Sequence, residues 1–165
     1  MIKKTVLILF PIVAILGVFF ILKTQNSLDI VNTKQEPLEF KDNQEQCPEC
    51  NMFLVGKKHT AQTVTSDGKT YFFDDIGCLI LWIEENKKDS KSLVSWVYAL
   101  DSNRWIKADK AFYSISDKTP MHYGFGAYEK NFDKSIEYND MKLKMLRGEN
   151  MTNTKIRKKI MDSIK

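Results

Sequence analysis

The chain has 165 residues, of which 43% are hydrophobic and 28% charged, and this fits one ordinary domain with an appendage. The net charge of +4 is modest and spread along the chain, without the basic stripe interleaved with aromatic residues that would indicate a nucleic-acid partner. The three cysteines are an odd number, so at least one cannot pair within the chain, and a framework of disulfides alone does not account for them.

An uncharged, apolar run at residues 5–22 follows Lys3 and Lys4. As a helix it would extend about 27 Å, which is enough to cross the hydrocarbon part of a bilayer. The two lysines place the N-terminus in the cytoplasm and the rest of the chain in the periplasm, beyond the inner membrane. We therefore predict a single-pass transmembrane anchor over residues 1–23. A cleaved signal peptide is the alternative, although no small-residue cleavage pattern follows Leu22.

Composition divides the rest of the chain into three parts. Residues 24–46 are polar, carry Pro37 and show little apolar periodicity, which is typical of a spacer that holds a domain clear of a membrane. Residues 47–130 contain the strand and turn patterns of the predicted domain. Residues 131–165 form a C-terminal helical extension.

Apolar alternation and turn residues predict most of the secondary structure of the domain. The predicted strands cover residues 59–65, 70–73, 93–100, 104–106, 111–115 and 124–128. The first two are joined by the hairpin turn Ser66-Asp67-Gly68-Lys69, which is of the Asp-Gly kind. A helix over 76–85 follows, capped by Asp74 or Asp75. This order predicts a small α+β domain of antiparallel strands with packed helices, built from two related ββ units.

The C-terminal extension contains two helical patterns, over residues 139–147 and 152–164. In the second pattern Ile156, Ile160 and Ile164 line one face, and basic residues surround them. We interpret it as a solvated helix that packs through its isoleucines. A basic amphipathic helix that contacts lipid headgroups or an acidic partner is the alternative.

The segment Cys47-Pro48-Glu49-Cys50-Asn51-Met52 places two thiols and a thioether within six residues. Thiolate and thioether sulfur favour Cu(I), whereas zinc takes thiolates in a four-ligand tetrahedron and has little use for methionine. Cys50 and Met52 would share one side of the chain if the backbone were extended. The segment therefore indicates a site for one soft metal ion, with Cu(I) preferred.

A bare Cys-x-x-Cys spacing leaves other interpretations open. Cys47 and Cys50 could form a disulfide in an oxidising compartment, or a redox pair of the thioredoxin type. They could also supply half of a zinc site, with His59 and His122 as the other half. Met52 favours copper among these, although a methionine can equally fill a core.

Further candidate donors lie elsewhere in the chain. Met121 and His122 follow a proline and are predicted to lie on a loop, where a methionine is less easily explained as core packing. His59 opens a strand, where a histidine is usually structural. Cys78 lies in the first turn of a capped helix, a position that can activate a thiol, but burial as a small hydrophobic residue is the preferred interpretation.

Together these segments resemble the NosL family, exported accessory proteins that deliver copper to nitrous oxide reductase. The resemblance covers about residues 47–128 and rests on five motifs in order: Cys47-Pro-Glu-Cys50-Asn-Met52, His59-Thr-Ala-Gln62, Tyr71-Phe-Phe-Asp-Asp75-Ile-Gly-Cys78, Trp105-Ile-Lys-Ala-Asp-Lys-Ala-Phe-Tyr113 and Pro120-Met-His-Tyr-Gly-Phe-Gly-Ala-Tyr128. It implies a small α+β domain of paired ββαβ-like halves, similar to a domain of organomercurial lyase.

By this resemblance Cys50 and Met52 correspond to the copper-binding Cys-Gly-Met segment of the family, and Met121 to the methionine of its Pro-Met-Gly-Tyr-Gly loop. Asn51 replaces the first glycine, and asparagine tolerates positive φ better than most residues. His122 replaces the second glycine and brings an imidazole beside the expected ligand. Family members are often lipoproteins, whereas this chain carries a predicted transmembrane helix instead.

The resemblance implies a membrane-anchored Cu(I) metallochaperone rather than an enzyme, with nitrous oxide reductase or its assembly machinery as the partner. Its expected ligands are Met52, Met121 and the thiols of Cys47 and Cys50. A thiol enzyme is the alternative: a disulfide oxidoreductase that uses Cys47 and Cys50, or a lyase that uses Cys78 with Asp75. A structural zinc module is the third interpretation.

Overall fold

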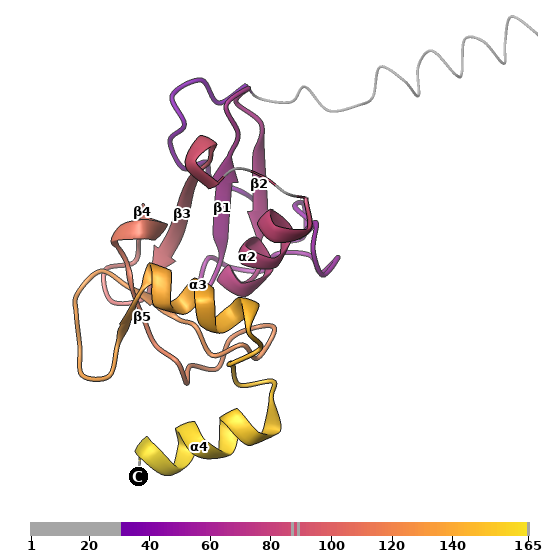
Figure 1. Cartoon of the computed structure of the whole chain (residues 1–165). Coiled ribbons are helices and arrows are strands. Elements are labelled where there is room, and N and C mark those ends of the chain that lie inside the picture. The colour runs from indigo at the N-terminus through magenta and orange to yellow at the C-terminus, as the bar shows by residue number, and fades with distance from the viewer. Residues whose placement is uncertain (1–30, 87, 89, 165) are drawn as a thin grey trace, which may run out of the picture. The chain divides into compact units, whose positions relative to one another are not determined.

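The structure, a computed structural model, describes residues 31–86, 88 and 90–164 (Figure 1). The predicted anchor over residues 1–23 lies outside these ranges. Within them, no helix combines the length and the apolar character that crossing a bilayer requires.

Four antiparallel strands form the first sheet, in the order β2-β1-β3-β4. They are β1 (Ala61–Val64), β2 (Thr70–Phe73), β3 (Val94–Ala99) and β4 (Arg104–Lys107). The predicted hairpin joins β1 and β2: the Thr65 N–H donates to the carbonyl of Lys69, and the Gly68 N–H to the carbonyl of Thr65, both at 2.9 Å. Gly68 has φ +82°, a left-handed conformation that glycine adopts without strain.

Strand β1 is buried along its whole length, although its alternating pattern predicts a half-buried strand. The residues just before the domain account for part of this burial. The Gln62 side chain exchanges two hydrogen bonds with the backbone of Leu38, at 2.8 and 3.1 Å, and the Trp96 indole donates to the Gln35 carbonyl at 3.0 Å. The C-terminal part of the predicted spacer, 24–46, therefore packs on the domain.

Helix α2 (Ile76–Glu85) begins two residues after β2 and contacts both β1 and β2 (Figure 1). Asp75 is its N-cap, with φ −143° and ψ 141°, and its carboxylate accepts from the Gly77 N–H at 2.9 Å. The helix buries the aliphatic residues Ile76, Leu79, Ile80 and Ile83. Each such side chain contributes about 1.5–3 kcal/mol on burial, so the start of α2 is firmly placed.

Three short strands form the second sheet, in the order β6-β5-β7. They are β5 (Phe112–Tyr113), β6 (Ala127–Tyr128) and β7 (Ile136–Glu137). Helix α3 (Tyr138–Leu146) follows β7, contacts α2 and buries Met141 and Met145. The remaining elements are the 3₁₀ helices Ser90–Ser92 and Ala108–Lys110 and helix α4 (Thr154–Ile164).

The predicted α+β class with antiparallel sheets is confirmed. The order β1, β2, α2, β3 matches one predicted ββαβ half. The second predicted half differs, because the three short strands β5, β6 and β7 precede helix α3. Only two residues pair as a strand within the predicted 124–128 segment. Gly124 has φ +96°, which interrupts the extended backbone just before β6.

Candidate metal centre

The cysteine segment folds as a tight turn. The Cys47 N–H donates to the Met52 carbonyl, and the Asn51 N–H donates to the Cys47 carbonyl, both at 2.9 Å. Asn51 has φ +61°, so the chain is not extended between Cys50 and Met52. Cys50 is half-buried, whereas the Met52 side chain is 40% exposed. The turn thus buries the Cys47 thiol, half-buries Cys50 and leaves Met52 at the surface.

Four potential metal ligands meet where this turn packs against the junction of β2 and α2. One donor atom from each of Cys47, Cys50, Asp74 and Cys78 lies within 4.8 Å of the others. Asp74 directly follows β2, and Cys78 lies in the first turn of α2. Cys47 and Cys78 are fully buried, so Cys50 is the only cysteine of this group with access to solvent.

The Asp74 carboxylate is directed into this group. Its Oδ1 accepts a hydrogen bond from the Cys50 thiol at 3.1 Å. Its Oδ2 is buried and has no hydrogen-bond partner among the described residues. A buried carboxylate oxygen without a partner loses its hydration without compensation, and an ion held by the four side chains would supply that compensation.

The three thiols have different proton affinities. Hydrogen bonding by the Cys78 thiol lowers the pKa of Cys47 to about 7, against the opposing effect of burial. Burial raises the pKa of Cys50 to about 12, and its bond to Asp74 acts in the same direction. The pKa of Cys78 is also raised, first by its hydrogen bond to Cys47 and then by burial. At mildly alkaline pH the metal-free group therefore carries one thiolate, at Cys47.

These four side chains could hold a metal ion. Three thiolates are soft donors that suit Cu(I), and they suit zinc as well. Zinc in a structural site normally takes four ligands, which would require the Asp74 carboxylate in addition to the three sulfurs. Cu(I) needs only the sulfurs. The donor set alone admits both ions.

A distant loop is fixed beside this group. The Met121 N–H donates to Asp75 Oδ2 at 3.3 Å, and Asp75 is the chain neighbour of Asp74. The Tyr123 ring lies so close to Gly77 that any side chain at that position would overlap it. The side chains of Met121 and Cys50 both pack against the hydrophobic core that contains Cys47 and Cys78. The Met121 backbone is thus held at the junction that carries Asp74 and Asp75, and the meeting of its thioether with the cysteine thiols stays a prediction.

The two histidines lie outside the four-residue group. His59 precedes β1 with φ +68°, and its half-buried ring has a lowered pKa because of burial. Its Nδ1 makes no hydrogen bond within the described part of the chain. His122 is exposed and has φ +58°, a left-handed conformation that glycine adopts more readily. The geometry gives neither imidazole a place in the group.

Sequence reasoning missed Asp74 as a donor and preferred a plain core role for Cys78. Asp74 was considered only as a helix cap, but Asp75 caps α2 and leaves the Asp74 carboxylate free to face the thiols. The available signal is the spacing Asp74-x-x-x-Cys78 across a helix start. This spacing indicates a metal site only when the turn at Cys47 is known to pack on the same junction.

No model of a known protein family matches the chain, and no curated protein sequence matches it.

Proposed function

We propose that the protein is a membrane-anchored Cu(I) metallochaperone that delivers copper in the periplasm for the assembly of nitrous oxide reductase. The observation that carries the proposal is the meeting of three free thiols from two separate segments within 4.8 Å. The ordered NosL-like motifs support the choice of copper and of the client. The apolar run at residues 5–22 supports the anchor.

The group of thiols suits a copper carrier because two of its members are buried and the third is accessible to solvent. Cys47 and Cys78 are fully buried and would retain Cu(I), whereas Cys50 reaches solvent beside the exposed Met52. A ligand of the client replaces Cys50 first, and copper then passes by ligand exchange. The ion stays in the Cu(I) state throughout. Thiol protons leave on loading and return on release, so no bond in a substrate is made or broken.

The thiol-enzyme alternative has less support from the geometry. An attacking thiol must be both ionised and accessible. Cys47 has the lowered pKa but is fully buried, and the accessible Cys50 has a raised pKa. The two requirements fall on different residues, which favours a metal carrier.

The proposal is tested by titrating the reduced full chain, held in detergent, with Cu(I) against a competing chelator. We expect one equivalent to bind and Cys78→Ser to weaken binding more than the roughly 10–100-fold typical of second-shell changes. Met52→Ala and Met121→Ala should weaken binding by smaller factors. Met161→Ala, another partly exposed methionine, is the matched control and should have no effect. Unchanged affinity in Cys78→Ser would refute the site.

Delivery is tested separately, by mixing the copper-loaded chain with metal-free nitrous oxide reductase in the presence of excess Cu(I) chelator. We expect copper to reach the reductase faster than the chelator alone can extract it from the carrier. If copper reaches the reductase no faster than the chelator extracts it from the carrier, the protein binds copper but has no delivery role.

A further inference from the structure

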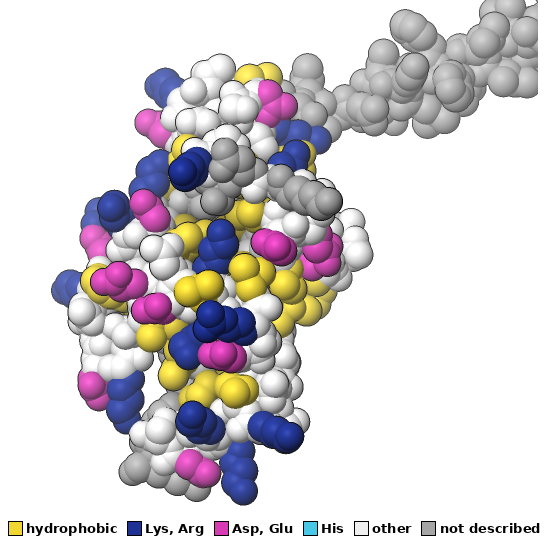
Figure 2. All heavy atoms as spheres, in the orientation of Figure 1, with side chains coloured by type: hydrophobic (Ala, Val, Ile, Leu, Met, Phe, Trp, Pro, Cys, Tyr) yellow, Lys and Arg dark blue, Asp and Glu magenta, His cyan; other side chains and the backbone are white. Residues whose placement is uncertain are grey.

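Helix α4 carries a concentration of positive charge that the metal centre does not use. Its basic side chains, Lys155, Arg157, Lys158 and Lys159, are all exposed, and Asp162 is its only acidic residue. None of the four forms an ion pair with any described residue. Lysine and arginine side chains gather around this end of the domain (Figure 2). The helix therefore presents a net positive surface to whatever approaches it.

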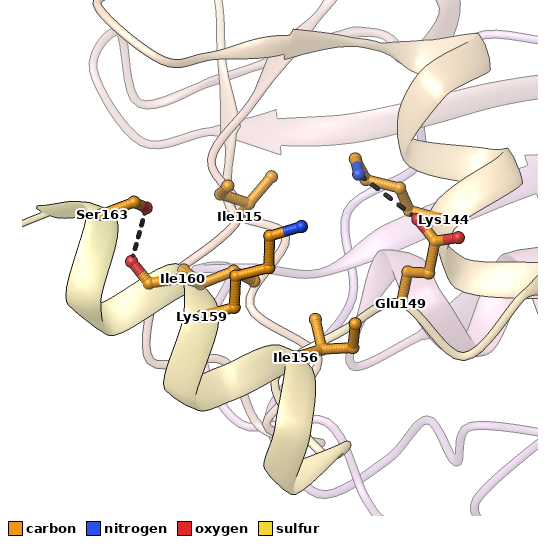
Figure 3. Close-up of a pocket in the computed structure, with 7 residues that line it drawn as sticks. All are labelled: Ile115, Lys144, Glu149, Ile156, Lys159, Ile160 and Ser163. Carbon is orange, nitrogen blue, oxygen red and sulfur yellow. Dashed lines mark hydrogen bonds and ion pairs between the residues drawn. The ribbon is translucent and has the colours of Figure 1, made fainter.

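The apolar side of α4 is only partly covered. Ile156 and Ile160 face Ile115 across a groove of about 240 Å³, and both isoleucines are half-buried (Figure 3). Met161, on the flank of the same helix, is 46% exposed. An amphipathic helix that packed fully on the domain would have closed this groove. Apolar surface thus remains available next to the cationic surface.

The polar rim of the groove adds to the positive charge. Lys144, near the end of α3, pairs with Glu149 at 3.5 Å and is neutralised. The Lys159 side chain extends from α4 toward the groove and has no such partner among the residues described (Figure 3). A ligand that combines negative headgroups with an apolar layer would satisfy the unpaired cations and cover the exposed Met161, whereas Ile156 and Ile160 face the domain.

We propose that α4 is a docking surface for an anionic phospholipid membrane. The exposed basic side chains contact phosphate groups, and the exposed Met161 lies at the headgroup boundary. Charge complementarity carries the choice: four cations against one acid in eleven residues match a negatively charged lipid surface. The contact is independent of copper binding, and it would hold the domain against the bilayer to which its N-terminus is proposed to be anchored.

The experiment compares amide hydrogen exchange of the full chain in phosphatidylcholine vesicles with exchange in phosphatidylcholine vesicles that contain phosphatidylglycerol. Exchange reports each segment separately, so an N-terminal anchor does not obscure the result. We expect amides of residues 154–164 to exchange about tenfold more slowly or slower with phosphatidylglycerol present, and high salt to remove the difference. Equal exchange in both vesicles would overturn the proposal.

The variant Lys155→Glu/Lys158→Glu should lose the protection, because each charge near the surface changes binding about fivefold. Lys118→Glu/Lys130→Glu, at two exposed sites outside α4, has the same net charge and should keep it. Unchanged exchange in α2 verifies that both variants fold. Equal protection of α4 by soluble polyglutamate would show that an acidic macromolecule suffices, and would also overturn the lipid assignment.

Discussion

At the scale of single residues, two of the three thiols in the candidate metal centre, Cys50 and Cys78, have raised pKa values and keep their protons without metal. A hydrogen bond from the Cys78 thiol stabilises Cys47 as a thiolate. Cys50 stays protonated, and its thiol donates a hydrogen bond to Asp74. Burying three thiolates and a carboxylate together would be very costly without a cation. Loading with copper must therefore release protons, and their number reports which thiols bind.

We expect Cu(I) loading at pH 8 to release about two protons, because Cys47 is already ionised above its pKa of about 7 whereas Cys50 and Cys78 are not. At pH 6 Cys47 is also protonated, so the release should rise to about three. The measurement is proton release into a weak buffer during titration. Release of one proton or fewer at pH 8 would mean that at most two of the three thiols bind the ion.

The N-cap Asp75 gives the fold a distinct pH dependence. It is fully buried, and burial raises the pKa of Asp75 from 3.8 to about 6 despite its hydrogen bonds. Because the folded pKa lies above the unfolded one, the stabilising contribution is complete at acidic pH and is lost as the pH rises through 6. The loss between pH 4 and pH 7.5 amounts to about 2–2.5 kcal/mol.

Asp75→Asn should remove this dependence, since asparagine caps a helix nearly as well but cannot ionise. Relative to the parent chain, the free energy of unfolding of the variant should rise by about 2–2.5 kcal/mol between pH 4 and pH 7.5. Urea denaturation of the reduced, metal-free proteins at the two pH values measures it. A stability difference that does not vary with pH would show that Asp75 ionises normally in the folded protein.

At the scale of elements, the junction of β2 and α2 organises the site. Strand β2 ends at Phe73, and Asp74 then accepts a hydrogen bond from the Cys50 thiol. Asp75 caps α2 and accepts a hydrogen bond from the Met121 N–H. Gly77 completes the arrangement, because the absence of a side chain there lets Tyr123 lie against the first turn of α2. The junction thus joins two candidate metal ligands, Asp74 and Cys78, to the loop that carries Met121.

Gly77→Ala tests this coupling. Alanine is the better helix former by about 1 kcal/mol, but its methyl group would overlap the Tyr123 ring. We expect a net loss of about 1–3 kcal/mol in the free energy of unfolding, together with weaker Cu(I) binding. In a Tyr123→Ala background the same change should stabilise the protein. Stabilisation by Gly77→Ala in the parent chain would contradict the packing described.

The secondary structure was largely predictable because its signals are local. Asp67-Gly68 defines the hairpin turn, and an aspartate before an apolar run defines the start of α2. The half-buried character assigned to β1 was wrong, because the preceding polar segment covers it through Leu38 and Gln62. The polar composition of residues 24–46 predicts a spacer. Contacts between residues far apart in the chain cannot be predicted from it, because they produce no periodic pattern in the sequence.

The candidate site was predictable only in part. Cys47 and Cys50 share a short motif, but Asp74 and Cys78 join them through tertiary packing. Aspartate is rarely buried, so a sequence pattern gives no reason to place Asp74 inside a core. The placement of His59 and His122 outside the group depends on left-handed backbone conformations that residue type does not reveal.

At the scale of the whole molecule, the site depends on three segments that are distant in sequence: the cysteine turn, the start of α2 and the loop at residues 119–124. Two of these segments supply the four donors, and the Met121 N–H holds the third at the same junction through Asp75. Helix α4 is separate from this assembly and is proposed to serve a membrane surface instead. Copper capture and membrane contact are thereby assigned to different parts of one domain.

The central claim is that Cys47, Cys50 and Cys78 bind one Cu(I) together, and X-ray absorption at the copper edge of the loaded full chain tests it most directly. We predict a Cu(I) edge with a shell of three sulfur neighbours, and a Cys78→Ser spectrum in which one sulfur is lost. A shell of nitrogen and oxygen, or a sulfur shell that Cys78→Ser leaves unchanged, would contradict the account.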